Sequence, residues 1–252
     1  MSNDAVLYDI ADRVATLTLN QPDNRNALTP ALLDGLGASL ESADADRFVR
    51  VIVLTNSGPA FCSGADLKGG GLASSKYDLP QILGTMQDSP KPVVGRIAGH
   101  CMGGGVGLAA ACDISIVRSD IKFGFTEVRI GVAPAIISVV CLPKMRRSDA
   151  LELFLTGERI SAERAAEVGL INSVADPDTF DQAVDSLVRK LLAGGPGALA
   201  ASKRLVFDIP GTDRATAFAR TAEISRQLFA SDEAAEGMTA FREKRPPHWP
   251  VR

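Results

Sequence analysis

The stretch CMGGGVGLAAACDISIV, residues 101–117, decides which fold this chain can adopt. Four of the five residues from 103 to 107 are glycine, small apolar residues follow, and DISIV is typical of a strand. Glycine in the first turn of a helix leaves backbone N–H groups open to a ligand, and the helix dipole adds partial positive charge there. The stretch therefore predicts a helix N-terminus that can hold an oxyanion.

Two alternative roles for these glycines stay open. Residues 105–110 fit a loose dinucleotide-binding pattern, which would suggest a nicotinamide dehydrogenase, although the acidic Asp113 precedes the next strand instead of ending it. No Gly-Lys-Ser/Thr sequence supports a phosphate-binding P-loop. The small residues could also serve only the close packing of a helix.

Strand and helix patterns alternate on both sides of this stretch. Residues 13–20 (RVATLTLN) alternate in polarity as a strand does, and residues 48–58 form a β-branched run. Between them, Thr29 and Pro30 are typical of an N-cap and a first helical residue. Leucines then fall on one helical face: Leu32, Leu33, Leu36 and Leu40. This order of strand, helix and strand predicts a parallel sheet in an α/β fold.

The C-terminal half is predicted to be mainly helical. After about residue 145 only residues 171–176 (INSVAD) are typical of a strand, and the helical patterns occupy 146–157, 161–169, 179–194, 197–208, 214–230 and 232–245. Glycine and proline interrupt the chain between 195 and 211. We therefore expect a core over residues 1–195 and a helical region over 196–252.

Composition excludes several classes of function. The chain has 252 residues, 46% of them hydrophobic, and a formal net charge of -3, so no general field attracts nucleic acid or anionic membrane. No apolar run is long enough to span a bilayer, and the N-terminus is unlike a secretory signal, which leads us to expect a cytoplasmic protein. The four cysteines show no metal-site spacing, and no metal is expected. The two histidines and the lack of a Gly-x-Ser-x-Gly sequence argue against a serine hydrolase.

A second group of free backbone amides is predicted at residues 60–68 (AFCSGADLK). This segment follows the buried strand pattern VIVLT, which places Ala65 and Asp66 in a loop. Two amide groups that follow parallel strands could converge on one oxygen atom.

Taken with these segments, the sequence resembles the enoyl-CoA hydratase/isomerase, or crotonase, family over nearly its whole length. The resemblance rests on six segments in the family's order: NRNALT, AFCSGADLK, GGGVGLAAACDI, FGFTEVRIGVAP, LFLTGERISAERAAEVGLIN and EGMTAFREKRPPHW. It implies a spiral of ββα units, a helical C-terminal trimerisation region, and homotrimers that commonly pair into hexamers.

The resemblance also implies a site for an acyl-CoA thioester. The amides of Ala65 and Gly104 would receive the thioester oxygen, and fixed amide dipoles stabilise the negative charge that builds there. Residues matching the family's CoA-binding positions are Ala27, Ser63, Asp66, Leu67, Phe241 and Lys244. The last two would reach CoA on a neighbouring subunit, although Lys244 could equally be a solvated charge. CoA would enter as part of the substrate, with no separate cofactor.

Glu127 stands at the family's second catalytic glutamate, where burial would raise its pKa and fit it for proton exchange. The first catalytic glutamate of well-characterised hydratases corresponds to Gly107. We expect the space vacated at Gly107 to accommodate a branched or carboxylated acyl chain. Arg129 and Lys68 could meet a substrate carboxylate, or could be surface charges or CoA phosphate contacts.

The expected activity is hydration of a 2-enoyl-CoA, with Glu127 transferring the proton. The motifs are most similar to bacterial 3-methylglutaconyl-CoA or isohexenylglutaconyl-CoA hydratases, which act in leucine or acyclic terpene breakdown. A single glutamate would also suffice for a 3-enoyl to 2-enoyl isomerase, and a non-catalytic acyl-CoA-binding protein remains an alternative. A decarboxylase or a thioester hydrolase is less favoured, since fold alone does not choose the chemistry.

Overall fold

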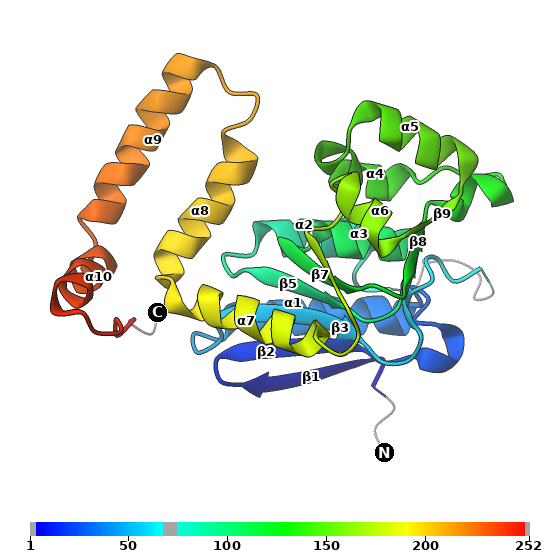
Figure 1. The fold of residues 1–252 in the computed structure, drawn as a ribbon, viewed down its shortest axis with the longest axis horizontal. Coiled ribbons are helices and arrows are strands. Elements are labelled where there is room, and N and C mark those ends of the chain that lie inside the picture. Colours follow the sequence, from blue (N-terminus) through cyan, green and yellow to red (C-terminus); the bar gives the residue numbers. More distant parts are fainter. Residues whose placement is uncertain (1–3, 68–74, 250–252) are drawn as a thin grey trace.

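The computed structural model describes residues 4–67 and 75–249, and within these ranges the strands form two sheets (Figure 1). The larger sheet has six strands in the order β1-β2-β3-β5-β7-β10. They are β1 (Val6–Ala11), β2 (Val14–Leu19), β3 (Val51–Asn56), β5 (Val93–Ile97), β7 (Ile114–Arg118) and β10 (Ser173–Ala175). All neighbours pair in parallel except β1, which is antiparallel to β2. The predicted parallel sheet is therefore present, with one antiparallel edge strand that the sequence analysis did not identify.

A smaller sheet of four short strands positions the loops that matter for function. Its order is β4-β6-β8-β9, formed by β4 (Ala60–Cys62), β6 (His100–Met102), β8 (Lys122–Gly124) and β9 (Arg159–Ser161). The first three are parallel, and β9 is antiparallel to β8. Each of β4, β6 and β8 directly follows a strand of the larger sheet, so the chain repeats a strand–strand–helix unit.

The expectation that 171–176 is the only strand after residue 145 was wrong, because β9 also forms there. Strands of three residues are too short to show a period of two, and β9 has the exposed, half-buried, exposed pattern of an edge strand.

The helices of the core cover the sheets. They are α1 (Pro30–Ala45), α2 (Leu79–Asp88), α3 (Gly104–Ala111), α4 (Ala135–Cys141), α5 (Arg147–Thr156), α6 (Ala162–Glu167) and α7 (Phe180–Ala193), with 3-10 turns η1 (Pro22–Asn24), η2 (Thr126–Ile130) and η3 (Leu142–Lys144). The Thr29 hydroxyl accepts a hydrogen bond from the Leu32 amide, which confirms the predicted N-cap. Every residue of α3 after Gly104 is buried.

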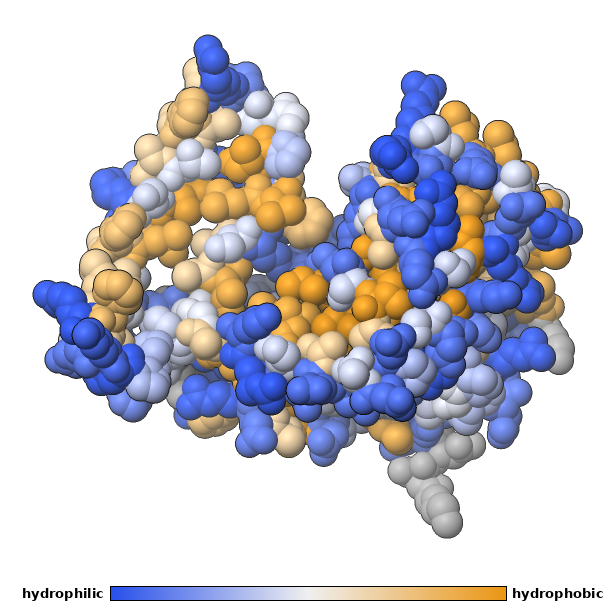
Figure 2. All heavy atoms as spheres, viewed as in Figure 1, coloured by the Kyte–Doolittle hydropathy of each residue, from blue (hydrophilic) through white to orange (hydrophobic). Residues whose placement is uncertain are grey.

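Helices α8 (Pro196–Asp208), α9 (Arg214–Phe229) and α10 (Asp232–Glu243) form an arm that extends from the core (Figure 1). No residue of α8 or α9 is buried, and apolar side chains lie open along the arm (Figure 2). The large exposed ones are Val206, Phe207, Phe218, Phe229, Met238 and Phe241. The division of the chain at 195/196 stays a prediction. None of the helices in the described ranges has the length and apolar character that a membrane crossing needs.

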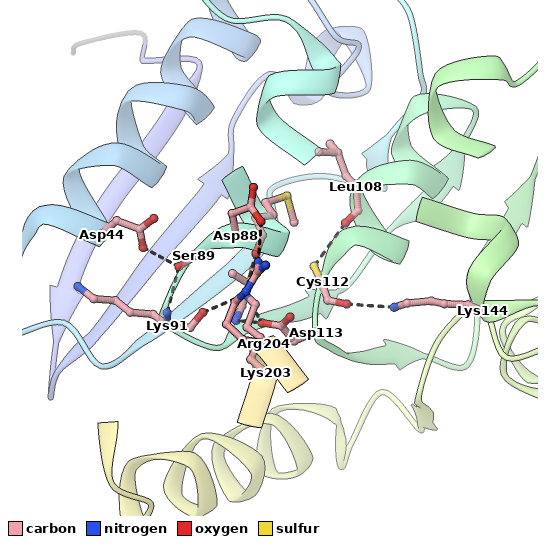
Figure 3. A network of polar contacts seen from close by, with 12 residues as sticks. Asp44, Asp88, Ser89, Lys91, Leu108, Cys112, Asp113, Lys144, Lys203 and Arg204 are labelled. Atoms are coloured by element: carbon pink, nitrogen blue, oxygen red, sulfur yellow. Dashed lines mark hydrogen bonds and ion pairs between the residues drawn. The ribbon is translucent and has the colours of Figure 1, made fainter. Parts of the chain in front are cut away.

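One lysine of α8, a half-buried residue whose side chain is almost fully covered, joins this arm to the core (Figure 3). The Lys203 ammonium of α8 lies 2.8 Å from a carboxylate oxygen of Asp113 and also donates to the carbonyl oxygens of Met86 and Lys91, at 2.8 and 3.2 Å. Only 7% of the Lys203 side chain is exposed. Asp113 also accepts a hydrogen bond from the Val93 amide, and burial raises the pKa of its carboxyl. The pair therefore joins α8 to the junction between α3 and β7.

We predict that Lys203→Met lowers the free energy of unfolding by about 3 kcal/mol or more, because it leaves the Asp113 charge buried without its partner. The neighbouring Arg204 makes exposed ion pairs with Asp88 and Asp208, so Arg204→Met should cost about 1 kcal/mol or less. Urea unfolding of both variants at one protein concentration checks this, and equal losses would contradict it.

Candidate active site

Three loops meet where β4, β6 and β8 end. Gly64 follows β4 with φ +90°, and a Cβ atom there would lie 3.1 Å from the Met102 carbonyl oxygen and 3.3 Å from the Gly104 nitrogen. Only glycine fits this backbone conformation and this close approach without strain. The loop is also held by the Leu28 amide, which donates to the Gly64 carbonyl oxygen at 2.8 Å. The loop that contains Gly64 therefore lies against the start of α3, as expected for the segment predicted at residues 60–68.

Both predicted oxyanion-binding residues lie at this meeting point. Gly104 is the first residue of α3, where a helix has no internal acceptor for its N–H group, and Ala65 directly follows Gly64. In the described ranges we find no acceptor for the N–H of Ala65 or of Gly104. Both line one cavity of about 790 Å³. The two N–H groups are available to a ligand oxygen.

Glu127 enters the same cavity from η2, the turn that follows β8. Its residue is half-buried, and its Oε2 atom is buried with no hydrogen-bond partner among the described residues. Burial raises the pKa of the Glu127 carboxyl above its ordinary value of 4.5. The Val132 amide donates to the Glu127 carbonyl oxygen, which helps to fix the turn. Glu127 is therefore not the surface carboxylate that a helix start alone would suggest.

Gly103 gives the Glu127 carboxyl room to reach the cavity. Its φ is +52°, and a Cβ atom there would lie 3.2 Å from the Oε1 atom of Glu127. A glycine is needed at this position both for the backbone conformation and for the close approach.

The space at Gly107 is not vacant, so the expectation that it accommodates an acyl chain was wrong. A Cβ atom at Gly107 would lie 2.3 Å from Cγ2 and 2.9 Å from Cβ of Ile137, whose buried side chain fills this place from α4. Ile137 itself lines the cavity. The sequence does not reveal this contact, because nothing in residues 135–141 indicates that this isoleucine faces Gly107.

The predicted CoA-binding residues divide into two groups. Ser63 and Leu67 line the cavity, and Asp66, next to Leu67 in the chain, is half-buried. Ala27 is buried and does not line the cavity. Phe241, which is 85% exposed on α10, and Lys244, the C-cap that follows α10, lie on the arm and do not line this cavity. Their predicted role therefore needs a second subunit.

Charged groups at the cavity include one that the sequence analysis overlooked. Arg129 lines the cavity, and its Nε donates to the Gly157 carbonyl oxygen at 2.9 Å. Arg159 of β9 lines it too, although the sequence shows it only as one charge within a longer motif. Lys68, the other candidate for meeting a substrate carboxylate, lies outside the described residues.

Other reactive groups are poorly suited to chemistry here. All four cysteines are free and buried, and burial raises the pKa of the Cys62 thiol to about 12. The His100 Nδ1 atom accepts a hydrogen bond from the Lys122 amide, as a structural histidine would. Within the described ranges, no group of three or more histidine, cysteine or acidic residues could hold a metal ion.

Comparisons with known proteins agree with this architecture. The family profile described as enoyl-CoA hydratase/isomerase matches residues 9–252. The crystal structure of an enoyl-CoA hydratase from Mycobacterium smegmatis superposes with a TM-score of 0.89 at 32% identity, covering 97% of this chain and 98% of that one. The predicted crotonase fold, with its two sheets and C-terminal helical region, is confirmed.

Two curated relatives add named activities of their own. The 2,3-dehydroadipyl-CoA hydratase of Escherichia coli K12 is 32% identical over 95% of this chain and 96% of the relative. The (E)-benzylidenesuccinyl-CoA hydratase of Thauera aromatica is 30% identical over 96% of this chain and 97% of the relative. With the family profile, these matches show that the chain belongs to the enoyl-CoA hydratase/isomerase, or crotonase, family of enzymes.

Proposed function

We propose that this enzyme adds water to a 2-enoyl-CoA thioester, with Glu127 as its single proton-transferring carboxylate. The observation that carries the proposal is the buried, unpaired Oε2 atom of Glu127, a residue that lines the same cavity as Ala65 and Gly104. A buried carboxylate without a partner is costly, and such costs are concentrated at functional sites.

In the proposed reaction the backbone N–H groups stabilise negative charge and the Glu127 carboxylate transfers the proton. The Glu127 carboxylate takes a proton from water as the water oxygen bonds to carbon 3. The electron pair of the double bond moves toward the thioester, and the charge that develops on its oxygen is stabilised by the two N–H groups. Glu127 then returns the proton to carbon 2, which restores its charge. One carboxylate therefore suffices for water activation and for protonation of carbon.

The CoA portion is proposed to lie beside residue 27, which precedes α1, and residues 63–67, which follow β4. Backbone groups of Ala27, Ser63, Asp66 and Leu67 would hold adenine and pantetheine, and the positions of Ser63 and Leu67 at the cavity support this. Phe241 and Lys244 would contact CoA bound to a neighbouring subunit.

We also propose that the acyl chain carries a distal carboxylate. The names of the two curated relatives describe acyl groups derived from dicarboxylic acids. Arg129 and Arg159 line the cavity, and neither forms an ion pair with a carboxylate of the described residues. A guanidinium group binds a carboxylate well because both are planar and the hydrogen bonds are charge-assisted. A place in leucine or terpene breakdown and a cytoplasmic location stay predictions that rest on the sequence alone.

One observation favours an isomerase as the second candidate. Ile137 fills the place beside Gly107 where the family resemblance puts a second carboxylate, so no carboxylate at position 107 helps Glu127 to hold water. Moving a double bond needs only one group that removes a proton from one carbon and returns it to another.

The arm is proposed to assemble the chain into trimers or dimers of trimers. Phe218 and Phe229 are each 70% exposed on α9, and apolar side chains gathered on one surface mark interaction sites. Copies of the same chain would cover this surface.

We expect Glu127→Gln to lower kcat/KM for hydration by about 10²- to 10⁴-fold, because the amide cannot take a proton from water. Mass spectrometry in ¹⁸O-labelled water measures the product from crotonyl-CoA, a carboxylated 2-enoyl-CoA and a 3-enoyl-CoA. Glu158→Gln, which changes an exposed cavity residue, is the matched control.

Water gain that depends on Glu127 supports the hydratase. Double-bond migration without water gain identifies the isomerase, and CoA binding without turnover of any thioester indicates an acyl-CoA-binding protein.

The proposed role of Glu127 predicts an acidic limb in the pH profile. The ionised form accepts the proton, so kcat/KM falls as pH drops through the pKa of Glu127 in the free enzyme. Burial raises this pKa, which places the limb above pH 4.5. Steady-state rates across the acidic range test this, and a limb at or below the ordinary glutamate value contradicts it.

The proposed assembly into trimers or dimers of trimers predicts the molecular mass of the protein in solution. Sedimentation equilibrium should give three or six times the chain mass of 26.5 kDa. Replacing Phe218 and Phe229 together by Glu should yield single chains, because charges cannot be buried in an apolar interface without cost. Phe48→Glu, at an exposed apolar residue of the core, should leave the assembly intact.

A further inference from the structure

We infer that Ile137 makes the acyl site selective for chains that are unbranched at carbon 3. This inference rests on the proposed function, and it deepens that function by defining the class of acyl chain. Ile137 is the cavity-lining residue that fills the place beside α3 where a side chain at position 107 would stand. The selectivity disfavours 3-methylglutaconyl-CoA as the substrate, since its name places a methyl group on carbon 3.

The contact between Ile137 and Gly107 is steric. Unlike Gly64 and Gly103, Gly107 lies inside a helix and has no positive φ, so its backbone does not require glycine. The three heavy atoms nearest to a Cβ at this position all belong to Ile137, and two of them would be closer than 3.0 Å. The absence of a side chain at Gly107 therefore leaves the space that the Ile137 side chain fills.

The position of Gly107 on α3 indicates where Ile137 lies relative to the acyl chain of the substrate. Gly107 is three residues beyond Gly104, about 4.5 Å farther along the helix axis at 1.5 Å per residue. Carbon 3 of an enoyl thioester lies two bonds beyond the carbonyl carbon whose oxygen the Gly104 amide would receive. For a chain that runs along α3 from this oxygen, the Ile137 side chain stands beside carbon 3.

Ile137 is held firmly in this place. It lies in the first turn of α4, is 2% exposed, and belongs to the same buried apolar cluster as Val106 and Leu108 of α3. The residues that precede it, Pro134 to Ile136, also line the cavity. A methyl branch on carbon 3 would have to displace a packed side chain, whereas an unbranched chain would not.

Two saturated thioesters test the inference without requiring turnover. Isovaleryl-CoA differs from butyryl-CoA by one methyl group on carbon 3, and titration calorimetry measures the Kd of each. We expect the wild-type enzyme to bind butyryl-CoA about tenfold or more tightly than isovaleryl-CoA, the discrimination typical of one methyl group in a packed pocket. Ile137→Ala should remove this preference. Ile136→Ala, which trims the adjacent cavity residue away from Gly107, should keep it.

A double-variant cycle tests the steric contact itself. Gly107→Ala alone should destabilise the protein because its methyl group meets Ile137, and adding Ile137→Ala should cancel most of that loss. Adding Ile136→Ala should not. An unchanged Kd ratio in Ile137→Ala, or additive stability losses for positions 107 and 137, would overturn the inference. Absence of hydration by the wild type with the expected Kd ratios would instead reject only the proposed function.

Discussion

The close approach of two backbone segments at the start of α3 is the constraint on which the site depends. A Cβ atom at Gly105 would lie 2.2 Å from the Cys62 carbonyl oxygen, and one at Gly99 would lie 2.5 Å from the Phe61 nitrogen. Side chains at these positions would push β4 and β6 apart. The small sheet would then no longer bring the amide of Ala65 next to that of Gly104. The glycines are thus required by backbone contact before any ligand is considered.

Function and stability oppose one another at Glu127. A carboxylate oxygen buried without a partner destabilises the folded state, and apolar residues such as Leu79 and Ile137 provide no hydrogen bond in the same cavity. The packed core that surrounds the site offsets this cost. The same apolar surroundings raise the pKa of Glu127 and so bring its basicity closer to that of a useful proton acceptor.

Sequence patterns predicted those features that depend on local chemistry. The cap at Thr29 and the leucine face of α1 follow from residues a few positions apart, and the helix start at Gly104 follows from its own glycines. The short strands β4, β6 and β8 could not be predicted, since three residues show no periodicity and their pairing joins distant parts of the chain. The contact between Gly107 and Ile137 also joins residues that are far apart in the sequence. The sequence therefore contains no sign that Ile137 fills the space left by the missing side chain.

Both ends of α3 have electrostatic roles, and the arm takes part in one of them. The Lys144 ammonium donates to the Cys112 carbonyl oxygen just past the C-terminus of α3, at 3.1 Å, and Asp113 next to it binds Lys203 of α8 (Figure 3). Positive charge near a helix C-terminus is favourable because it opposes the negative end of the helix dipole. The arm is therefore anchored to the C-terminal end of α3, the helix that begins with Gly104. A shift of α8 relative to the core would thus act on the helix that carries the proposed oxyanion-binding amide.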